Sequence, residues 1–363
     1  MKKLLFIVNG LGMGNATRCE SIIERLIDKK IDIEILTSGN GLQYFKDRGY
    51  VSKLYELSAL YYGSKNGQLS IWRTLFEIPQ FILIFFNNVR FLRNLLRATD
   101  YSGVVIDSDY TIGWLRPWVR VPVFALNNAD VVLEECRKLT EIPREVRMQY
   151  LIEKSDAWYH RAIPDMVFSP TIESRKSANT RTLKHFPPFV RQGLNVRTTK
   201  DELRTILIML SGSQFSTGIE FLQTLARRGA LQIQVVGREG ESNDWITFHG
   251  KVYQNRDMIN QADLMVINGG FSAVSEAVVL RKPAVVIPVP HHAEQFINAL
   301  TVERAGLGLM AKRENIPEKI NEVIDRFPEF VEAHRSFGCP ANGAKLAAEN
   351  IYAEISSQVV SVN

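Results

Sequence analysis

Short apolar runs alternate with longer amphipathic segments along the chain. Such runs are typical of buried strands, and the segments between them have helical spacing. Strands that alternate with helices predict parallel sheets joined by right-handed crossovers. The predicted strands lie at 4–8, 31–37, 103–106, 121–126 and 166–170 in the first half, and at 205–210, 231–236, 246–248, 264–267 and 284–287 in the second.

This rhythm begins twice, and 363 residues are natural for two domains. We expect an α/β protein with two Rossmann-like, doubly wound domains that face each other across a cleft. The proline pair Pro187-Pro188 and the polar stretch 198–202 indicate a linker. The first domain is therefore placed at 1–197 and the second at 198–338. A last segment, 339–363, contains a helix that we expect to pack back on the first domain.

Composition narrows the class of protein but not its activity. The chain is 45% hydrophobic and 23% charged, and its net charge of +5 suits acidic partners such as nucleotide diphosphates or anionic lipid. No nucleic-acid partner is expected, and the sequence does not indicate an oligomeric state.

The expected location is cytoplasmic. Cys19, Cys136 and Cys339 are far apart and lack metal-binding spacing, which favours a reducing compartment. The apolar run after Met1-Lys2-Lys3 is too short for a signal peptide. A peripheral position on the inner face of the membrane is a further possibility.

The stretch from Asn268 to Glu276 joins a predicted strand to a predicted helix through two glycines. Gly269 and Gly270 let a ligand approach the backbone, and the free N–H groups at the start of the helix favour a phosphate. Glu276 lies about one turn inside the helix, where its carboxylate can accept hydrogen bonds from ribose hydroxyls. A plain tight turn with Ser272 as the helix cap is the alternative interpretation.

A second glycine loop, Gly10 to Gly14, follows the first strand. It lacks the later glycine of a complete dinucleotide fingerprint, so the motif is weak by itself, and a simple turn between strand and helix is the alternative interpretation. Asp107 and Asp109 follow the strand at 103–106 and should face the cleft, because ligands of open α/β sheets bind at the carboxyl ends of strands. Loop capping is the alternative role for both aspartates.

The segment 69–97 is unusually apolar and is flanked by arginines. Arg73, Arg90, Arg93 and Arg97 surround an aromatic-rich run with one acid, Glu77. A basic amphipathic helix of this kind can lie on an anionic membrane surface. A helix buried in the core with a basic edge is the alternative.

The second half resembles the donor domain of GT-B glycosyltransferases, in particular the MurG-like group. Four motifs carry the resemblance and together cover about residues 205–310. They are Ser211-Gly212-Ser213; the segment from Phe248 to Val252 with 258–263; Asn268-Gly269-Gly270 with Ser272, Ser275 and Glu276; and Lys282 to Pro288 leading to Glu294-Gln295 and Asn298. The first half matches only in its opening loop and strand rhythm.

The resemblance implies a nucleotide-sugar site on the second domain. The Val252 backbone would hold uracil near Phe248, and Glu276 would bind the ribose hydroxyls. Residues 211–213, Asn268, Gly269, Gly270, Ser272 and Ser275 would form the diphosphate site, while Glu294 and Gln295 would bind the donor sugar. On the acceptor side, the family's loop implies roles for Gly12, Gly14 and Arg18.

One departure from the family pattern concerns catalysis. The position of the usual general-base histidine is Asn15, which cannot take a proton at neutral pH. Three accounts are open. Another residue is the base, with Asp109 or Asp107 as candidates and His185 behind them; the acceptor is already ionised; or the protein binds without turnover.

The resulting hypothesis is an inverting, metal-independent transferase that moves a sugar from a UDP-sugar to an acceptor hydroxyl, in envelope polysaccharide or glycolipid synthesis. The UDP-sugar is a co-substrate, and no cofactor or metal is expected, because the Asp107–Asp109 spacing lies in the acceptor half and His291-His292 suits a loop better than a metal site. The acceptor would be a sugar, a lipid-linked sugar or a small molecule. A nucleotide-sugar hydrolase or epimerase, or a silent binding subunit, are the alternatives.

Overall fold

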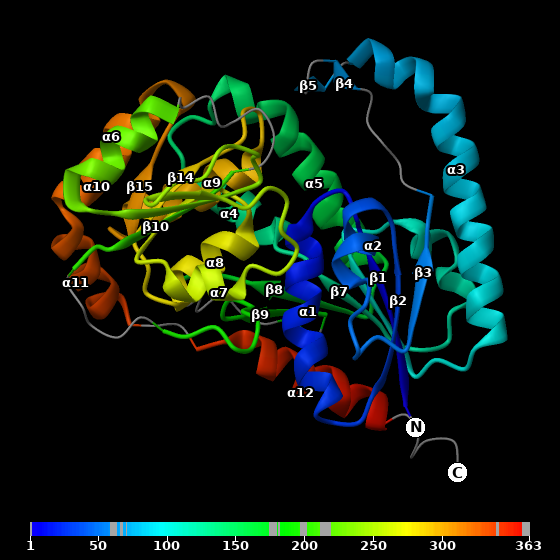
Figure 1. The fold of residues 1–363 in the computed structure, drawn as a ribbon. Coiled ribbons are helices and arrows are strands. Elements are labelled where there is room, and N and C mark those ends of the chain that lie inside the picture. The colour runs from blue at the N-terminus through cyan, green and yellow to red at the C-terminus, as the bar shows by residue number, and fades with distance from the viewer. Residues whose placement is uncertain are drawn as a thin grey trace.

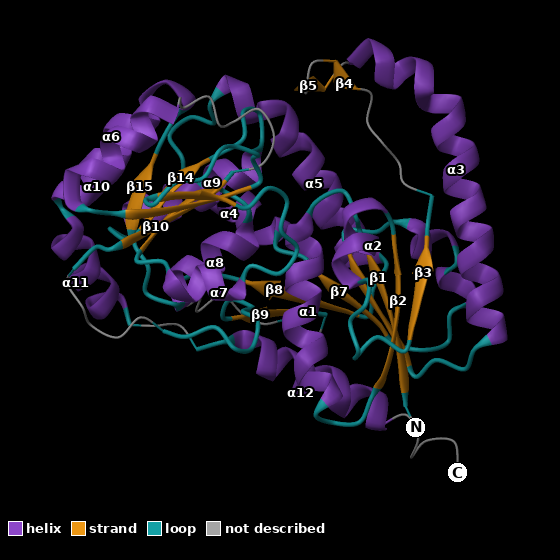
Figure 2. Cartoon of the chain, in the orientation of Figure 1, coloured by secondary structure: helices purple, strands orange, loops and turns teal. Residues whose placement is uncertain are grey.

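The structure is a computed structural model with two α/β domains, confirming the predicted fold class (Figure 1). It describes residues 2–58, 64–65, 68–69, 71–173, 180, 182–196, 202–210, 219–338 and 341–357. Each domain is built on one parallel sheet with helices on both faces (Figure 2). A small antiparallel pair, β4 (Ser64–Lys65) and β5 (Gln68–Leu69), precedes helix α3.

The N-terminal sheet has seven parallel strands in the order β3-β2-β1-β6-β7-β8-β9. The strand order reverses between β1 and β6, which pair with Val8 opposite Asp107. The strands are β1 (Lys3–Val8), β2 (Asp32–Thr37), β3 (Lys53–Glu56), β6 (Gly103–Asp107), β7 (Val123–Leu126), β8 (Met166–Pro170) and β9 (Leu183–Phe186).

The C-terminal sheet has six parallel strands in the order β12-β11-β10-β13-β14-β15. Its order reverses between β10 and β13, directly before the two glycines of the expected phosphate site. The strands are β10 (Thr205–Met209), β11 (Gln232–Val236), β12 (Ile246–Phe248), β13 (Leu264–Asn268), β14 (Ala284–Ile287) and β15 (Gly308–Met310).

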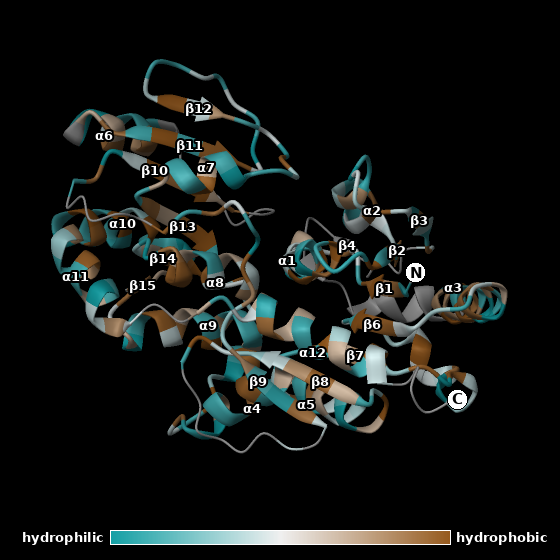
Figure 3. Cartoon of the chain, turned by 90° about the horizontal axis from the view of Figure 1, so that it is seen from below, coloured by the Kyte–Doolittle hydropathy of each residue, from teal (hydrophilic) through white to brown (hydrophobic). Residues whose placement is uncertain are grey.

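The helices surround these sheets, and the apolar strands lie at the centre of each domain (Figure 3). The N-terminal domain carries α1 (Met13–Ile27), α2 (Gly39–Phe45), α3 (Ile71–Ala98), α4 (Ala129–Arg137) and α5 (Arg147–Ala162). The C-terminal domain carries α6 (Ile219–Gly229), α7 (Arg256–Gln261), α8 (Phe271–Val279), α9 (Ala293–Arg304), α10 (Ile316–Asp325) and α11 (Phe327–Phe337).

Several helices and strands were not predicted from the sequence. Strand β9 reads Leu-Lys-His-Phe, and as an edge strand it carries polar residues that weaken the apolar signal. Helix α11 begins at Phe327 with Pro328 in its first turn, where proline is tolerated because that N–H has no helical partner. The short elements α2, β3 and β15 were also not predicted.

The last helix, α12 (Gly343–Ser357), packs on the N-terminal domain. Ala344, Ala348 and Ile351 belong to the same apolar cluster as the first strand and α1. The chain therefore crosses between the domains twice, and the two crossings touch each other. Val190 and Asn342 exchange two hydrogen bonds, and the Gly343 amide donates to the Pro188 carbonyl at 2.9 Å.

In the part of the chain that the structure describes, no helix has both the length and the apolar character to cross a membrane.

Candidate functional site

The two domains meet where each sheet reverses its strand order. Ligands of doubly wound sheets bind outside the carboxyl ends of the strands at this point. In the N-terminal domain, the loop between β1 and α1 and the end of β6 lie there, and in the C-terminal domain the β13–α8 turn does. Helices α1 and α8 pack against each other across the interface.

At the turn between β13 and α8, two glycines allow other groups to come close to the backbone. A side chain at Gly269 would collide with the carbonyl of Gln295, whereas Gly270 opens to empty space and caps α8. The Ser272 hydroxyl donates to the Gly14 carbonyl at 2.7 Å, which joins the first turn of α8 to the first turn of α1. Gly12 caps α1, so the N-termini of two helices lie at one place.

Other members of the predicted diphosphate site are less exposed. Ser275 is fully buried, and its hydroxyl has no hydrogen-bond partner among the described residues. The Asn268 side chain donates to the Ile287 carbonyl at 3.1 Å and so ties β13 to β14. Ser211, Gly212 and Ser213 lie outside the described residues.

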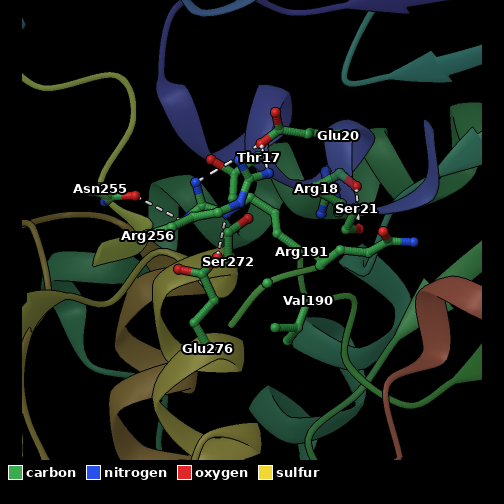
Figure 4. Close-up of polar contacts among 12 residues, drawn as sticks. Thr17, Arg18, Glu20, Ser21, Val190, Arg191, Asn255, Arg256, Ser272 and Glu276 are labelled. Carbon is green, nitrogen blue, oxygen red and sulfur yellow. Dashed lines mark hydrogen bonds and ion pairs between the residues drawn. The ribbon is translucent and has the colours of Figure 1, made fainter. Parts of the chain in front are cut away.

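Glu276 is buried and forms an ion pair that the sequence did not indicate (Figure 4). Its Oε1 accepts a hydrogen bond from Arg191 Nε at 2.8 Å, and its other oxygen has no partner among the described residues. Arg191 belongs to the crossing between the domains. One carboxylate oxygen is therefore held by the protein and the other can accept a ligand hydroxyl.

The predicted uracil site lies at one end of the interface. Phe248 ends β12, and Val252 follows in the next loop, where it packs against the C-terminal core. A cavity of about 720 Å³ lies between the loops after β1 and β2 and the residues on either side of Val252, Lys251 and Tyr253. Space is thus available beside the expected nucleobase.

The predicted sugar-binding residues lie at the other end of the interface. Glu294 stands in the first turn of α9, and Asn128 of the N-terminal domain approaches its Oε1 at 3.4 Å. The Gln295 side-chain oxygen accepts from the Val289 amide at 3.0 Å, which leaves its NH₂ group to donate. The sugar end therefore has contributions from both domains.

Asp107 and Arg18 form a buried pair within the N-terminal domain. Arg18 donates through Nε to Oδ2 at 2.8 Å and through Nη2 to Oδ1 at 2.5 Å, and Asp107 is fully buried. Such bidentate pairs are strong and directional. Both oxygens of the predicted base and the guanidinium of the predicted acceptor residue are thus engaged with each other.

Asp109 and Asn15 are more accessible. One oxygen of Asp109 accepts from the amide of Thr111 at 2.8 Å and from its hydroxyl. Burial raises the pKa of Asp109, although the Thr111 hydrogen bonds oppose this effect. Asn15 is half-buried in the first turn of α1, with a long 3.5 Å contact to the Asn9 carbonyl. His185, the third candidate, bonds to Asp130 at 2.7 Å instead.

A further acidic group stands near the sugar end. Glu153 on α5 is nearly buried and faces Glu294 of the other domain. Burial and the charges of Glu294 and Asp156 raise the pKa of Glu153 to about 8. This shift favours the protonated carboxyl group, which can donate a hydrogen bond.

Comparison with known proteins identifies the family. A family model described as glycosyl transferase family 1 matches residues 2–328, which is most of the chain. The chain belongs to this glycosyltransferase family. It is therefore an enzyme of the GT-B type.

Several curated relatives cover most of this glycosyltransferase. An uncharacterised glycosyltransferase of Methanopyrus kandleri is 24% identical over 284 residues, 75% of this chain and 82% of the relative. The UDP-N-acetylglucosamine–N-acetylmuramyl-(pentapeptide) pyrophosphoryl-undecaprenol N-acetylglucosamine transferase of Shouchella clausii is 24% identical over 370 residues, 92% of this chain and 94% of the relative.

Solved structures confirm the GT-B fold. MurG of Acinetobacter baumannii is similar with a TM-score of 0.58 and 16% identity, over 97% of this chain and 99% of that one. LpCGTa, solved in complex with UDP, is similar with a TM-score of 0.63 and 15% identity, over 98% of this chain and 99% of that one.

Several residues of the transferase's interface were not predicted. Arg191, Glu20 and Arg256 meet there, and Asn128 approaches Glu294. One feature of the sequence could have indicated this interface: Arg191 is a cation directly after the apolar segment 186–190. Glu20 and Arg256 sit on ordinary amphipathic helices, where a charged residue is normally expected to face solvent.

Proposed function

We propose that this glycosyltransferase moves a sugar from a UDP-sugar to an acceptor hydroxyl with inversion and without a metal ion. The observation that carries the proposal is the joint presence of two helix N-termini at Gly12 and Gly270 and a half-satisfied carboxylate at Glu276. Amides at helix starts suit a diphosphate, and a buried carboxylate oxygen suits a ribose hydroxyl.

The relatives favour uridine as the nucleoside. The names of the Shouchella clausii relative and of a Bacillus subtilis relative, 30% identical over 115 residues, both specify UDP-sugars, and one similar structure holds UDP. In this chain, Val252 beside the cavity would hold uracil, and Glu294 with Gln295 would contact the sugar. The dipoles of α1 and α8 would stabilise the departing diphosphate in place of a cation.

Asp109 is the base candidate that the geometry favours. Asp107 is engaged through both oxygens with Arg18, whereas Asp109 uses one oxygen for Thr111. A general base works best when its pKa lies near the working pH, and burial shifts the pKa of Asp109 in that direction. Asn15 would orient the acceptor by hydrogen bonds.

The donor class is tested by binding. Calorimetry with UDP, UDP-glucose, UDP-N-acetylglucosamine, GDP-mannose and dTDP-glucose should show heat for the uridine compounds at the lowest concentrations. Equal affinity for GDP-mannose would refute the uridine assignment, and no binding of any nucleotide would refute the proposed function.

The reaction class is tested by turnover of the preferred donor with a panel of acceptors. Transfer should depend on acceptor, and the Asp109→Asn variant should bind UDP normally while turnover falls about 100-fold or more. Free sugar released at full rate without acceptor would instead indicate a hydrolase, and an anomeric configuration that is retained would refute inversion.

A lipid-linked acceptor at an anionic membrane is the part of the proposal that rests on α3. On this outer helix Leu83 is 66% exposed and Ile82 and Phe86 are about half exposed, with the exposed Trp114 in edge-to-face contact with Phe86. Arg90, Arg93 and Arg97 are on the same helix. Apolar side chains beside cations match the interface of an anionic bilayer.

Flotation with liposomes tests this contact. The wild type should float with vesicles of phosphatidylglycerol and phosphatidylcholine but not with phosphatidylcholine alone, and Arg90/Arg93/Arg97→Glu should abolish flotation. A double variant of surface arginines on the other domain, Arg228/Arg326→Glu, is the control. Equal flotation of all three proteins would remove the arginines of α3 from the contact, and no flotation of the wild type would remove the membrane from the proposal.

A further inference from the structure

Glu20 of α1 is a fully buried carboxylate at the junction of the two domains. The hydroxyls of Tyr44 and Tyr50 donate to its two oxygens at 2.5 and 2.6 Å. Arg48 of its own domain lies 3.4 Å away, and Arg256 of α7 in the other domain lies 2.9 Å away. Arg256 also binds Glu24, one turn further along α1.

Arg191 extends this cluster to the predicted ribose carboxylate (Figure 4). Its side chain is almost fully buried, and each guanidinium nitrogen has a different neighbour. Nε donates to Glu276 at 2.8 Å, Nη2 donates to Asn255 at 2.9 Å, and Nη1 lies 3.4 Å from the Tyr44 hydroxyl and 3.9 Å from Glu20. A continuous chain of charges therefore runs from Glu20 to Glu276.

The charges of the cluster balance, with three carboxylates (Glu20, Glu24 and Glu276) and three guanidinium groups (Arg48, Arg191 and Arg256). Groups this deeply buried are tolerated only with their partners, because a charge left alone in the interior is strongly unfavourable. Moving the C-terminal domain away from α1 would take Arg256 from Glu20. The buried cluster therefore favours the closed arrangement.

We propose that Glu20, with Arg191 and Arg256, positions Glu276 for the nucleotide and couples donor binding to closure of the two domains. This inference rests on the proposed function. Arg191 holds one oxygen of Glu276 and aims the other at the ribose, while the same guanidinium lies against α1. A nucleotide that binds Glu276 is thereby favoured in the closed state, and opening disorders the ribose site.

The test replaces Glu20, which is on the domain opposite the proposed nucleotide site. Glu20→Gln keeps the shape of the side chain and removes its charge. UDP affinity, measured by calorimetry, should fall about tenfold, the order typical of coupling between two sites. Small-angle X-ray scattering should show a larger radius of gyration for the variant without ligand, and a return toward the wild-type value at saturating UDP.

Glu34 provides a matched control in the same domain. It is a buried carboxylate in β2 that also accepts hydrogen bonds from two tyrosines, Tyr55 and Tyr101, and from a cation, Lys3. Glu34→Gln should lose a similar amount of stability without changing UDP affinity or radius of gyration. A loss of affinity in both variants would show a general effect of N-terminal destabilisation and overturn the coupling.

A second variant pair covers the case in which Glu20→Gln does not fold. Arg256→Met should raise the KM for the UDP-sugar more than it lowers kcat, and Arg256→Lys should restore part of the loss because a cation again reaches Glu20 and Glu24. The coupling would be overturned if Glu20→Gln kept the wild-type UDP affinity and radius of gyration, or if Arg256→Met kept the wild-type KM. Either result would leave the proposed function intact. A wild type that binds no nucleotide would overturn the proposed function as well.

Discussion

Two buried carboxylate–arginine pairs stand at equivalent places in the two domains, and they differ in how fully they are satisfied. Asp107 is the last residue of β6, beside the reversal of the N-terminal sheet, and each of its oxygens accepts a hydrogen bond from Arg18. Glu276 follows the corresponding strand of the C-terminal sheet by one helical turn, and Arg191 takes one oxygen. Arg18 binds both oxygens of Asp107. Arg191 binds one oxygen of Glu276, and the other oxygen has no partner among the described residues.

The difference separates a structural role from a binding role. A bidentate pair within one domain holds α1 against the end of β6, and the Cys19 thiol and the Ser108 hydroxyl also donate to its two oxygens, so the protein itself occupies the carboxylate. A pair with one unfilled oxygen at a domain interface can accept a ligand without giving up its own bond. The residue types are similar in both places, so the number of satisfied oxygens is the feature that distinguishes them.

The largest effect is expected from breaking the complete pair. Asp107→Ala leaves Arg18 buried without its partner, and we expect a loss of about 3–5 kcal/mol in the free energy of unfolding. Urea denaturation monitored by tryptophan fluorescence measures it. A loss below about 1 kcal/mol would mean that solvent reaches Arg18. The Asp107–Arg18 pair would then have no special structural role that sets it apart from the Glu276–Arg191 pair.

Breaking the half-satisfied pair should affect binding more than stability. In Glu276→Ala, Arg191 keeps Asn255 and the neighbouring Tyr44 and Glu20, so the fold should tolerate the change better than Asp107→Ala. Affinity for UDP should fall by about 1–3 kcal/mol, the usual effect of losing a buried polar contact. Unchanged affinity in calorimetry would remove the ribose role of Glu276.

Among the residues that the structure describes, no cation pairs with a third carboxylate, Glu153, and we expect it to make the stability of the fold depend on pH. Its folded-state pKa is raised to about 8, so the folded protein keeps a proton that the unfolded chain loses above its ordinary pKa of 4.5. Stability should therefore fall as pH rises from about 5 to 8. Glu153→Gln should be more stable than the wild type at pH 8 by about 1–3 kcal/mol and equal to it near pH 4.5.

Thermal melts of both proteins across this pH range measure the effect. A constant difference between Glu153→Gln and the wild type at all pH values would show that Glu153 is ionised in the folded protein.

The smallest effect is expected from an exposed contact between the same two domains. Lys251 donates to Asn40 at 2.7 Å on the surface. Exposed polar contacts contribute little because water replaces them, so Lys251→Ala should change UDP affinity by no more than about 0.5 kcal/mol. A loss as large as that of Glu276→Ala would mean that Lys251 binds the nucleotide directly.

The fold was predictable because it depends on patterns within short segments. Apolar runs such as 4–8 and 264–267 are buried in any parallel sheet, and their order along the chain indicated two doubly wound domains. Edge strand β9 was missed because only one of its four residues is buried. Helix α11 was missed as well, and its first turn contains Pro328, a residue that can stand at the start of a helix but disrupts its interior.

The donor side was easier to anticipate than the interface between the domains. Gly269 and Gly270 follow a strand, so local sequence indicates their turn. The pairing of Glu20 with Arg256 joins residues 236 positions apart and depends on how two separately folded domains dock. Nothing in the sequence of an amphipathic helix reveals that one of its acidic residues will face a second domain, and only the docking of the two domains brings Arg191 and its partners together.

The double crossing between the domains has a mechanical consequence. Residues 187–191 and 341–343 run side by side and are hydrogen-bonded to each other, so two joined chain segments connect the domains. A single connecting segment would allow one domain to rotate freely relative to the other. Two joined segments resist twisting, and we expect them to permit bending about one axis. In the opening that we propose, bending about that axis would separate α8 from α1 along one path, and closing would bring Ser272 back to Gly14 and Arg256 back to Glu20.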